Sequence, residues 1–176
     1  MNFKDNIKIL TIDKPLKLDC GETINNYPIA YETYGKLNKN KDNAILVFHA
    51  LSGDQFVTGI NPVTNKSGWW SHAVGPSKAV DTNKYFVICA NVMGGCMGSY
   101  GPNSIDLKNN KKFGTNFPVI TINDMVNAQY NLLDFFKIDK LYSVMGGSMG
   151  GMQVLQFVAN FPNKTRTAIP LSLIHI

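Results

Sequence analysis

Short apolar runs alternate with segments of helical periodicity along most of the chain. Residues 44–48, 85–90 and 141–145 are nearly continuous runs of aliphatic, β-branched and aromatic residues, typical of strands buried on both faces of a sheet. Residues 125–136 and 152–159 instead repeat apolar residues at helical spacing. Strands that alternate with helices form parallel β/α units. The pattern therefore predicts an α/β protein with a mostly parallel sheet and flanking helices.

The beginning of the chain follows a different period. Residues 15–21 and 29–35 alternate apolar and polar positions and each end at a glycine, which predicts two antiparallel strands joined as a hairpin. Residues 55–83 are rich in turn signals and predict an irregular stretch with a short helix near 77–80. Residues 165–170 predict one more strand after the second helix.

Two further signals concern helix starts and packing. Thr121, followed three residues later by Asp124, is an approximate capping box at the start of the first helix. The pair Trp69-Trp70 lies in the irregular stretch, and we expect it to pack as a lid over the core rather than to bind a cofactor.

The segment between the strand over 141–145 and the second helix contains the motif G-x-S-x-G, centred on Ser148. In this context the motif predicts a nucleophile elbow, a tight turn that presents the serine Oγ above the sheet. Gly146 and Gly150 prevent collisions where the backbone comes close to itself, and the free N–H groups of the helix N-terminus favour developing negative charge. The alternative is a glycine-rich turn with an incidental serine. The two flanks favour Ser148 as a nucleophile.

The strand over 44–48 ends in a loop that starts His49-Ala50-Leu51. In an α/β-hydrolase such a loop donates one oxyanion-hole N–H, and the residue after the nucleophile donates the other. The candidates are the backbone amides of Leu51 and Met149. His49 precedes the nucleophile, whereas the fold places its catalytic histidine last. We therefore expect His49 to be a structural, hydrogen-bonded residue.

The cysteines give no indication of a metal site or a disulfide framework. Cys20, Cys89 and Cys96 are odd in number and have no C-x-x-C spacing, which fits a reducing, cytoplasmic location. Cys96 lies in a glycine-rich loop, 91–99, that lacks the nucleotide-binding patterns. No sequence feature supplies a base for its thiol, so we expect Cys96 to line a pocket. We expect no metal and no bound cofactor.

Composition limits the classes of partner. A chain of 176 residues with 44% hydrophobic and 16% charged residues fits one globular domain. The net charge of +5 comes almost entirely from lysines in polar loops, since Arg166 is the only arginine. A nucleic-acid surface would typically combine arginine with aromatic residues. No apolar run approaches the ~20 residues of a membrane span. We expect neither nucleic acid nor membrane as a partner.

Several segments are similar, in the same order, to the homoserine O-acetyltransferases of methionine biosynthesis, which have the α/β-hydrolase fold. The segments are 49–54, 68–70, 85–89, 91–96, 98–104, 117–125 and 146–153. The resemblance runs from about residue 15 to residue 170. One departure is Ser71-His72, where the family tends to carry acidic residues, and we assign no role to His72.

The resemblance implies acyl transfer in two steps. Ser148 would take the acyl group from acetyl-CoA or succinyl-CoA and pass it to the hydroxyl of L-homoserine, while the amides of Leu51 and Met149 hold the oxyanion. It also implies a homodimer at full length. The residues that bind homoserine, and the choice between acetyl and succinyl donors, stay open.

The catalytic triad does not close within this sequence. In α/β-hydrolases the nucleophile is followed by an Asp or Glu and then by a histidine. No Asp or Glu follows Ser148, and the only later histidine, His175, comes too early for the base of this fold. Because an unactivated serine is a weak nucleophile, we expect the 176-residue chain to be inactive.

Residues 171–176 depart abruptly from the family pattern and look like the in-frame translation of a sequencing adapter. We expect residues 1–170 to be the N-terminal part of one α/β-hydrolase domain, truncated after the strand that follows the elbow helix, and 171–176 to be a non-native tail. The missing part would hold the remaining strands, the lid and the triad Asp and His. Its absence would expose a sheet edge and an apolar face, so we expect the fragment to aggregate.

Two other classes of function stay open. One is a homoserine O-succinyltransferase, a serine O-acyltransferase or an esterase on the same scaffold, which homoserine-dependent consumption of acyl-CoA would distinguish. The other is a non-catalytic interaction protein that keeps the elbow for packing. Codons for a late Asp and His would argue against it.

Overall fold

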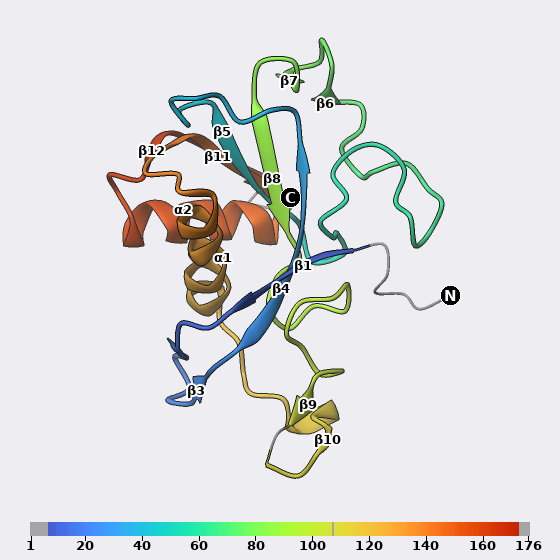
Figure 1. Cartoon of the computed structure of the whole chain (residues 1–176), viewed down its shortest axis with the longest axis vertical. Coiled ribbons are helices and arrows are strands. Elements are labelled where there is room, and N and C mark those ends of the chain that lie inside the picture. Colours follow the sequence, from blue (N-terminus) through green and yellow to red (C-terminus); the bar gives the residue numbers. More distant parts are fainter. Residues whose placement is uncertain (1–6, 107, 173–176) are drawn as a thin grey trace.

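The apolar runs form the centre of a six-stranded sheet in the computed structural model, which describes residues 7–106 and 108–172 (Figure 1). The strand order is β1-β4-β8-β5-β11-β12. The strands are β1 (Lys8–Ile12), β4 (Tyr27–Tyr34), β5 (Ala44–Phe48), β8 (Phe86–Ala90), β11 (Leu141–Gly147) and β12 (Thr165–Leu171). The adjacent strand pairs β8–β5, β5–β11 and β11–β12 are parallel, whereas β4 is antiparallel to β1 and β8. The predicted fold class is confirmed.

Parallel pairing brings the carboxyl ends of three central strands to the same edge of the sheet. Val47 of β5 is paired with Cys89 of β8, and Phe48 of β5 is paired with Gly146 of β11. The loops that follow β5, β8 and β11 therefore leave the sheet side by side. This edge is where open α/β sheets bind ligands.

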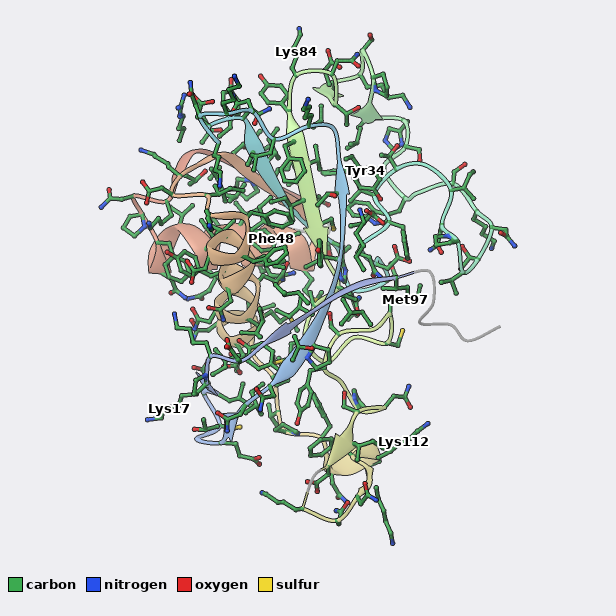
Figure 2. All side chains as sticks on the ribbon, viewed as in Figure 1. Lys17, Tyr34, Phe48, Lys84, Met97 and Lys112 are labelled. Atoms are coloured by element: carbon green, nitrogen blue, oxygen red, sulfur yellow. The ribbon has the colours of Figure 1, made fainter. Side chains whose placement is uncertain are left out.

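Two helices cover one face of the sheet. These are α1 (Ile122–Phe136) and α2 (Met149–Asn160). Phe48, labelled in Figure 2, lies at the end of β5. It packs against Phe157 of α2 with the ring centroids 6.0 Å apart. The same cluster includes buried side chains of both helices, of alternate positions in β5 and β8, and Leu141 and Val144 of β11. The periodicity that predicted the helices thus corresponds to their core-facing sides.

The irregular segment covers the opposite face. Trp69 and Trp70 are half-buried and pack against a second cluster that includes Val47 and Met145. Their ring centroids lie 5.1 Å apart. The expectation that the two tryptophans form a lid over the core is confirmed.

The prediction of a helix near 77–80 was wrong. Ser77 has a positive φ of 57°, and its N–H donates to the Asp81 carboxylate at 2.9 Å, which makes a turn. Val80 already belongs to β7. The short elements outside the main sheet are β2 (Leu16–Lys17), β3 (Thr23–Ile24), β6 (Val74–Gly75), β7 (Val80–Asp81), β9 (Ile105–Asp106), β10 (Lys111–Lys112) and the 3-10 helix η2 (Gly114–Asn116).

The predicted hairpin was half correct. The arm over 29–35 lies in β4, but the partner of β4 is β1 rather than the segment 15–21. The physical reason lies at the start of α1, where the predicted capping box of Thr121 and Asp124 is present. Asp124 also accepts the N–H of Asp19 at 3.0 Å, which ties that segment to the helix instead of to the sheet.

β12 is the last strand of the sheet and is exposed along most of its length. Ile169 and Leu171 are 42% and 39% exposed, and Met152 and Leu155 of α2 are 48% and 51% exposed. The predicted exposed edge and apolar face are therefore present in the described part of the chain. Within that part, no helix is both long and apolar enough to cross a membrane.

Candidate active site

Ser148 is the residue that joins β11 to α2. Its φ of 56° and ψ of −124° lie outside the regions that a non-glycine residue ordinarily adopts, and it forms the N-cap of the helix. The Ser148 N–H donates to the Leu171 carbonyl of β12 at 2.9 Å, and its carbonyl accepts the Met152 N–H at 3.1 Å. The sequence motif therefore forms a strained strand-to-helix turn, as predicted.

The glycines on either side of Ser148 allow this turn. A Cβ at Gly146 would lie 2.6 Å from the Gly150 carbonyl oxygen, and one at Gly150 would lie 2.2 Å from the Phe48 carbonyl oxygen. A Cβ at Gly147 would meet nothing nearer than 4.0 Å. Gly146 and Gly150 are thus required by close backbone packing, whereas Gly147 is not.

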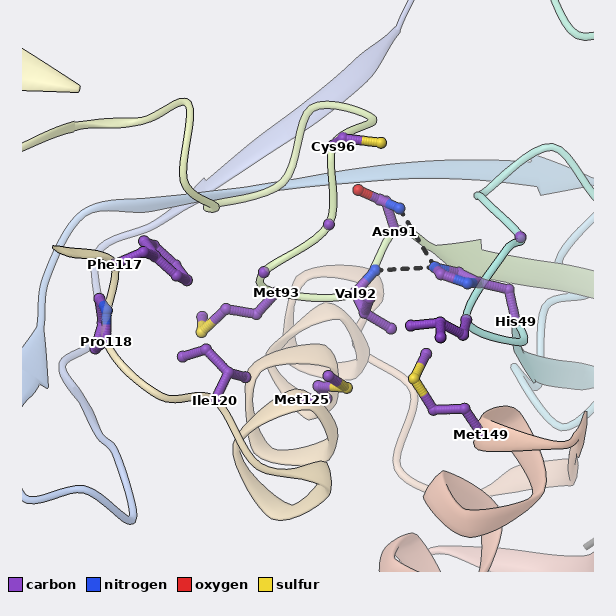
Figure 3. Close-up of a pocket in the computed structure, with 14 residues that line it drawn as sticks. His49, Asn91, Val92, Met93, Cys96, Phe117, Pro118, Ile120, Met125 and Met149 are labelled. Atoms are coloured by element: carbon purple, nitrogen blue, oxygen red, sulfur yellow. Dashed lines mark hydrogen bonds between the residues drawn. The ribbon is translucent and has the colours of Figure 1, made fainter. Parts of the chain in front are cut away.

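A cavity of about 430 Å³ lies beside the elbow (Figure 3). Leu51 and Met149, the two candidate oxyanion donors, both line it, although they lie far apart in the sequence. Its side-chain walls are mainly apolar: Met93, Phe117, Pro118, Ile120 and Met125. Among the described residues, no Asp, Glu, Lys or Arg lines this cavity.

His49 is one of the residues that line the cavity and is 1% exposed. Its Nδ1–H donates to the Ala50 carbonyl at 2.7 Å, and its Nε2 accepts the Val92 N–H at 3.1 Å. Burial lowers the pKa of the imidazole, against smaller opposing effects of the Ala50 hydrogen bond and the Asp54 carboxylate. Both ring nitrogens are engaged, so the ring is not free to take a proton from Ser148. This agrees with the structural role expected for His49.

Asn91 organises the glycine-rich loop after β8, and sequence reasoning did not identify it. Its Nδ2 lies 3.3 Å from Nε2 of His49, and its Oδ1 accepts the Met97 N–H at 3.1 Å. Cys96 of this loop lines the cavity, as expected. The available signal was that Asn91 is the first residue after a buried strand.

Gln153 was also missed. It is fully buried under the elbow, where its Nε2 approaches the His49 and Met149 carbonyls at 3.4 and 3.5 Å. Its Oε1 accepts from Nε2 of Gln129 in α1 at 2.8 Å. A polar residue on the buried face of an apolar helix was the signal that could have identified it.

Arg166 lies away from these groups, at the start of β12. It is 3.6 Å from the Asp42 carboxylate, and its guanidinium lies 6.0 Å from the ring centroid of Tyr142. The elbow adjoins the other end of the strand, since Gly147 is paired with Leu171. Arg166 is therefore not placed to bind a substrate beside Ser148.

Comparison with known proteins gives a consistent result. The family model for the alpha/beta hydrolase fold matches residues 43–172. A homoserine O-acetyltransferase of Pelagibacter ubique (strain HTCC1062) is 74% identical over 172 residues, which cover 98% of this chain and 46% of that protein. A homoserine O-acetyltransferase of Nitrobacter hamburgensis is 57% identical over 160 residues, covering 91% of this chain and 40% of that protein. The chain spans less than half the length of these relatives.

Solved structures agree. The homoserine O-acetyltransferase from Bacillus anthracis superposes with a TM-score of 0.83 at 34% identity. The superposition covers 93% of this chain and 45% of the Bacillus anthracis chain. Esterase E22 superposes with the same TM-score, 0.83, at 33% identity. This superposition covers 91% of this chain and 45% of the esterase chain. The expected resemblance is confirmed, and it extends to an esterase.

Proposed function

This chain belongs to the alpha/beta hydrolase fold family, and from this premise we propose that it is the N-terminal part of a homoserine O-acetyltransferase. The observation that carries the proposal is the 74% identity to the Pelagibacter ubique protein of that name across nearly the whole chain. The aligned region includes the elbow and both loops that line the cavity. The complete enzyme would transfer an acyl group from acyl-CoA to the hydroxyl of L-homoserine, as a step toward methionine.

In the proposed first step, Ser148 Oγ attacks the thioester carbonyl and its proton passes to a base. The C–S bond breaks, CoA leaves as the thiol, and an acyl-serine ester forms. In the second step the homoserine hydroxyl attacks this ester, and Ser148 recovers its proton. The histidine base and its carboxylate partner would come from the part of the enzyme that follows this chain, because no Asp or Glu follows Ser148 here.

The amides of Leu51 and Met149 would stabilise the oxyanion in both steps. Met149 is the first residue of α2, so its N–H has no acceptor within the helix. Leu51 lines the same cavity from the loop after β5. Removing one such donor typically costs about 2.7–4 kcal/mol of transition-state stabilisation.

The walls of the cavity favour acetyl over succinyl as the transferred group. A succinyl group carries a carboxylate, which requires a cation or several hydrogen-bond donors when it is removed from water. None of the described residues that line the cavity is cationic. We therefore take acetyl-CoA as the donor and keep succinyl-CoA as the alternative. CoA is a cosubstrate here and not a bound cofactor.

The test uses the full-length enzyme encoded by the source gene. Continued release of CoA from acetyl-CoA, beyond one equivalent per active site, should require L-homoserine and should be much slower with succinyl-CoA or with L-serine. Rapid release from succinyl-CoA would shift the assignment to an O-succinyltransferase.

A second candidate is ester hydrolysis, which the similarity to esterase E22 favours. In that case water would replace homoserine in the second step. Cleavage of simple acetyl esters at a rate unaffected by homoserine would support the esterase and contradict the transferase.

The remaining expectations belong to the complete enzyme. We propose a homodimer in the cytoplasm, the location being supported by the free thiols of Cys20, Cys89 and Cys96. We also propose that the enzyme's own sequence ends at residue 170 in this chain and that 171–176 are foreign, although Leu171 continues β12 and residues 173–176 lie outside the described residues. Reading the source DNA beyond the Pro170 codon tests this: a frame that continues to a late Asp and His is expected, and a stop after Ile176 would contradict the enzyme assignment.

A further inference from the structure

His49 is a buried ionisable residue that has no chemical step in the proposed acyl transfer. It lies between two loops that line the cavity, the one after β5 and the one after β8 (Figure 3). A polar ring in such a place is costly unless each of its nitrogens has a partner. Its partners therefore indicate what the ring does.

The partner of Nδ1 is the carbonyl of the next residue, Ala50, at 2.7 Å. The same carbonyl also accepts the N–H of Gly53 at 2.8 Å. Two donors thus fix the direction of the Ala50 C=O. This carbonyl belongs to the same peptide group as the N–H of Leu51.

A trans peptide group is planar, and its C=O and N–H point in opposite directions. The described chain contains no cis peptide bond. The two hydrogen bonds that hold the Ala50 carbonyl on the side of His49 therefore turn the Leu51 N–H to the other side. Leu51 is one of the residues that line the cavity, together with Met149.

The other side of the ring fixes its tautomer. Nε2 accepts the Val92 N–H at 3.1 Å and lies 3.3 Å from Nδ2 of Asn91, so Nε2 must be unprotonated and the proton must be on Nδ1. The backbone of His49 is held as well, because its carbonyl is approached by Gln153 Nε2 at 3.4 Å. The ring cannot rotate without breaking these contacts.

We propose that His49 is a positioning residue, whose neutral imidazole is oriented by Val92 and Asn91 and directs the Leu51 N–H toward the oxyanion. The inference rests on the proposed acyl transfer for its kinetic consequence, but its geometry does not depend on that function.

Protonation of Nε2 would place two N–H groups against each other at Val92 and would release the peptide group. The charged group that acts on the ring is Asp54 of the same loop. Asn91 and Val92 after β8 and Gln153 of α2, which also face His49, are neutral. Burial holds the pKa of His49 below its usual value, so the neutral ring is the form present at neutral pH.

Three variants of the full-length enzyme test the proposal. His49→Leu removes the donor to Ala50, and His49→Asn keeps it, because an asparagine amide nitrogen occupies nearly the position of the histidine Nδ1. His72→Leu is the matched control, since His72 is exposed. We expect His49→Leu to lower kcat by about 100-fold, the scale of one lost oxyanion donor, with little change in the KM for acetyl-CoA.

We expect His49→Asn to restore kcat at least tenfold relative to His49→Leu. On the acid side of the kcat–pH profile, His49→Asn should remove the contribution of His49 and keep the limb that the histidine base produces. His72→Leu should leave kcat unchanged. Thermal unfolding and circular dichroism establish that each variant is folded. Equal losses of kcat in His49→Leu and His49→Asn that follow equal losses of thermal stability would overturn the proposal, because they indicate packing alone. An unchanged kcat and pH profile in His49→Leu would also overturn it.

A second measurement separates this inference from the proposed function. Nitrogen-15 shifts of the His49 ring in the full-length protein should report a neutral ring with the proton on Nδ1 at neutral pH. A ring that is protonated on Nε2 or is cationic at that pH would overturn the positioning role. If the wild-type protein transfers no acyl group, the proposed function fails, and the ring shifts still decide the geometry.

Discussion

At the scale of single residues, Ser148 keeps a backbone conformation that costs on the order of 1–3 kcal/mol in a non-glycine residue. The surrounding backbone over-determines this conformation. Gly146 and Gly150 allow β11, α2 and the end of β5 to approach within direct contact, and the Leu171 carbonyl accepts the Ser148 N–H. The strain is thereby localised at the residue for which we propose nucleophilic chemistry.

The two neighbouring glycines before Ser148 differ in their tolerance of a methyl group. In the full-length enzyme, Gly146→Ala should lower the free energy of unfolding by about 2 kcal/mol or more, because the new Cβ would lie 2.6 Å from the Gly150 carbonyl oxygen. Gly147→Ala is the matched control and should change it by about 0.5 kcal/mol or less. Urea unfolding checks both values. Equal losses in the two variants would contradict the close approach at Gly146.

His49 gives stability a defined pH dependence. Its pKa is lowered in the folded protein, so the unfolded chain takes up the proton first as the pH decreases. The stability of the full-length enzyme should be unaffected by His49 above about pH 6.5 and should decrease from there toward the folded pKa. The raised pKa of Asp54 acts in the opposite direction, since the folded protein takes up that proton first and gains stability, beginning at the folded pKa of Asp54.

Urea unfolding between about pH 7.5 and about pH 5 measures this slope. The loss of stability on acidification should be smaller in His49→Asn than in the wild type. A slope that His49→Asn leaves intact would show that another group causes it.

At the scale of elements, local patterns predicted what depends on local physics. The three central strands, both helices, the capping box at Thr121 and the turn at Ser148 follow from apolar runs, side-chain caps and glycines close in sequence. The pairing of β1 with β4 and the turn at Ser77 were not predicted. The strand pairing depends on long-range bonds such as the one from Asp19 to Asp124, 105 positions apart. The turn depends on a positive φ at Ser77 and on its bond to the Asp81 side chain, and neither shows in a pattern of apolar positions.

The same limit applies to the candidate site. Ser148, Leu51 and Met149 came from a motif and its expected context, and the structure brings Leu51 and Met149 to one cavity. Asn91 and Gln153 act through His49, which is 42 and 104 positions away from them. No local spacing in the sequence reports such contacts.

The cap of α1 links one element to the N-terminal segment. Thr121 accepts the Asp124 N–H at 3.2 Å and donates to the Asp19 carboxylate. Thr121→Ala should therefore lower the free energy of unfolding of the full-length enzyme by about 1–2 kcal/mol. Thr115→Ala, at an exposed threonine of η2, is the control and should have almost no effect. A loss at Thr121 no larger than that at Thr115 would contradict the capping contribution.

At the scale of the whole molecule, the 176-residue chain has an exposed strand at one edge of its sheet and apolar side chains exposed on β12 and α2. Unpaired strand edges and contiguous apolar surface promote association. In the relatives, more than half of the sequence lies outside the aligned region.

The isolated chain should therefore self-associate at micromolar concentration. Light scattering and analytical ultracentrifugation check this. Ile169→Lys should slow the association, because charge on an edge strand opposes pairing. Ile60→Lys, at a residue that is 65% exposed in the irregular segment, should have little effect. A soluble monomer that unfolds cooperatively at this length would contradict the expectation.

Ser148 as the acyl-carrying residue is the central claim, and mass spectrometry tests it most directly. The full-length enzyme is mixed with acetyl-CoA without homoserine, quenched in acid and digested. We expect a mass increase of one acetyl group on the peptide that contains Ser148, its loss when L-homoserine is added before quenching, and its absence in Ser148→Ala. An acetyl group on another residue, such as Cys96, or an adduct that persists in Ser148→Ala, would contradict the claim.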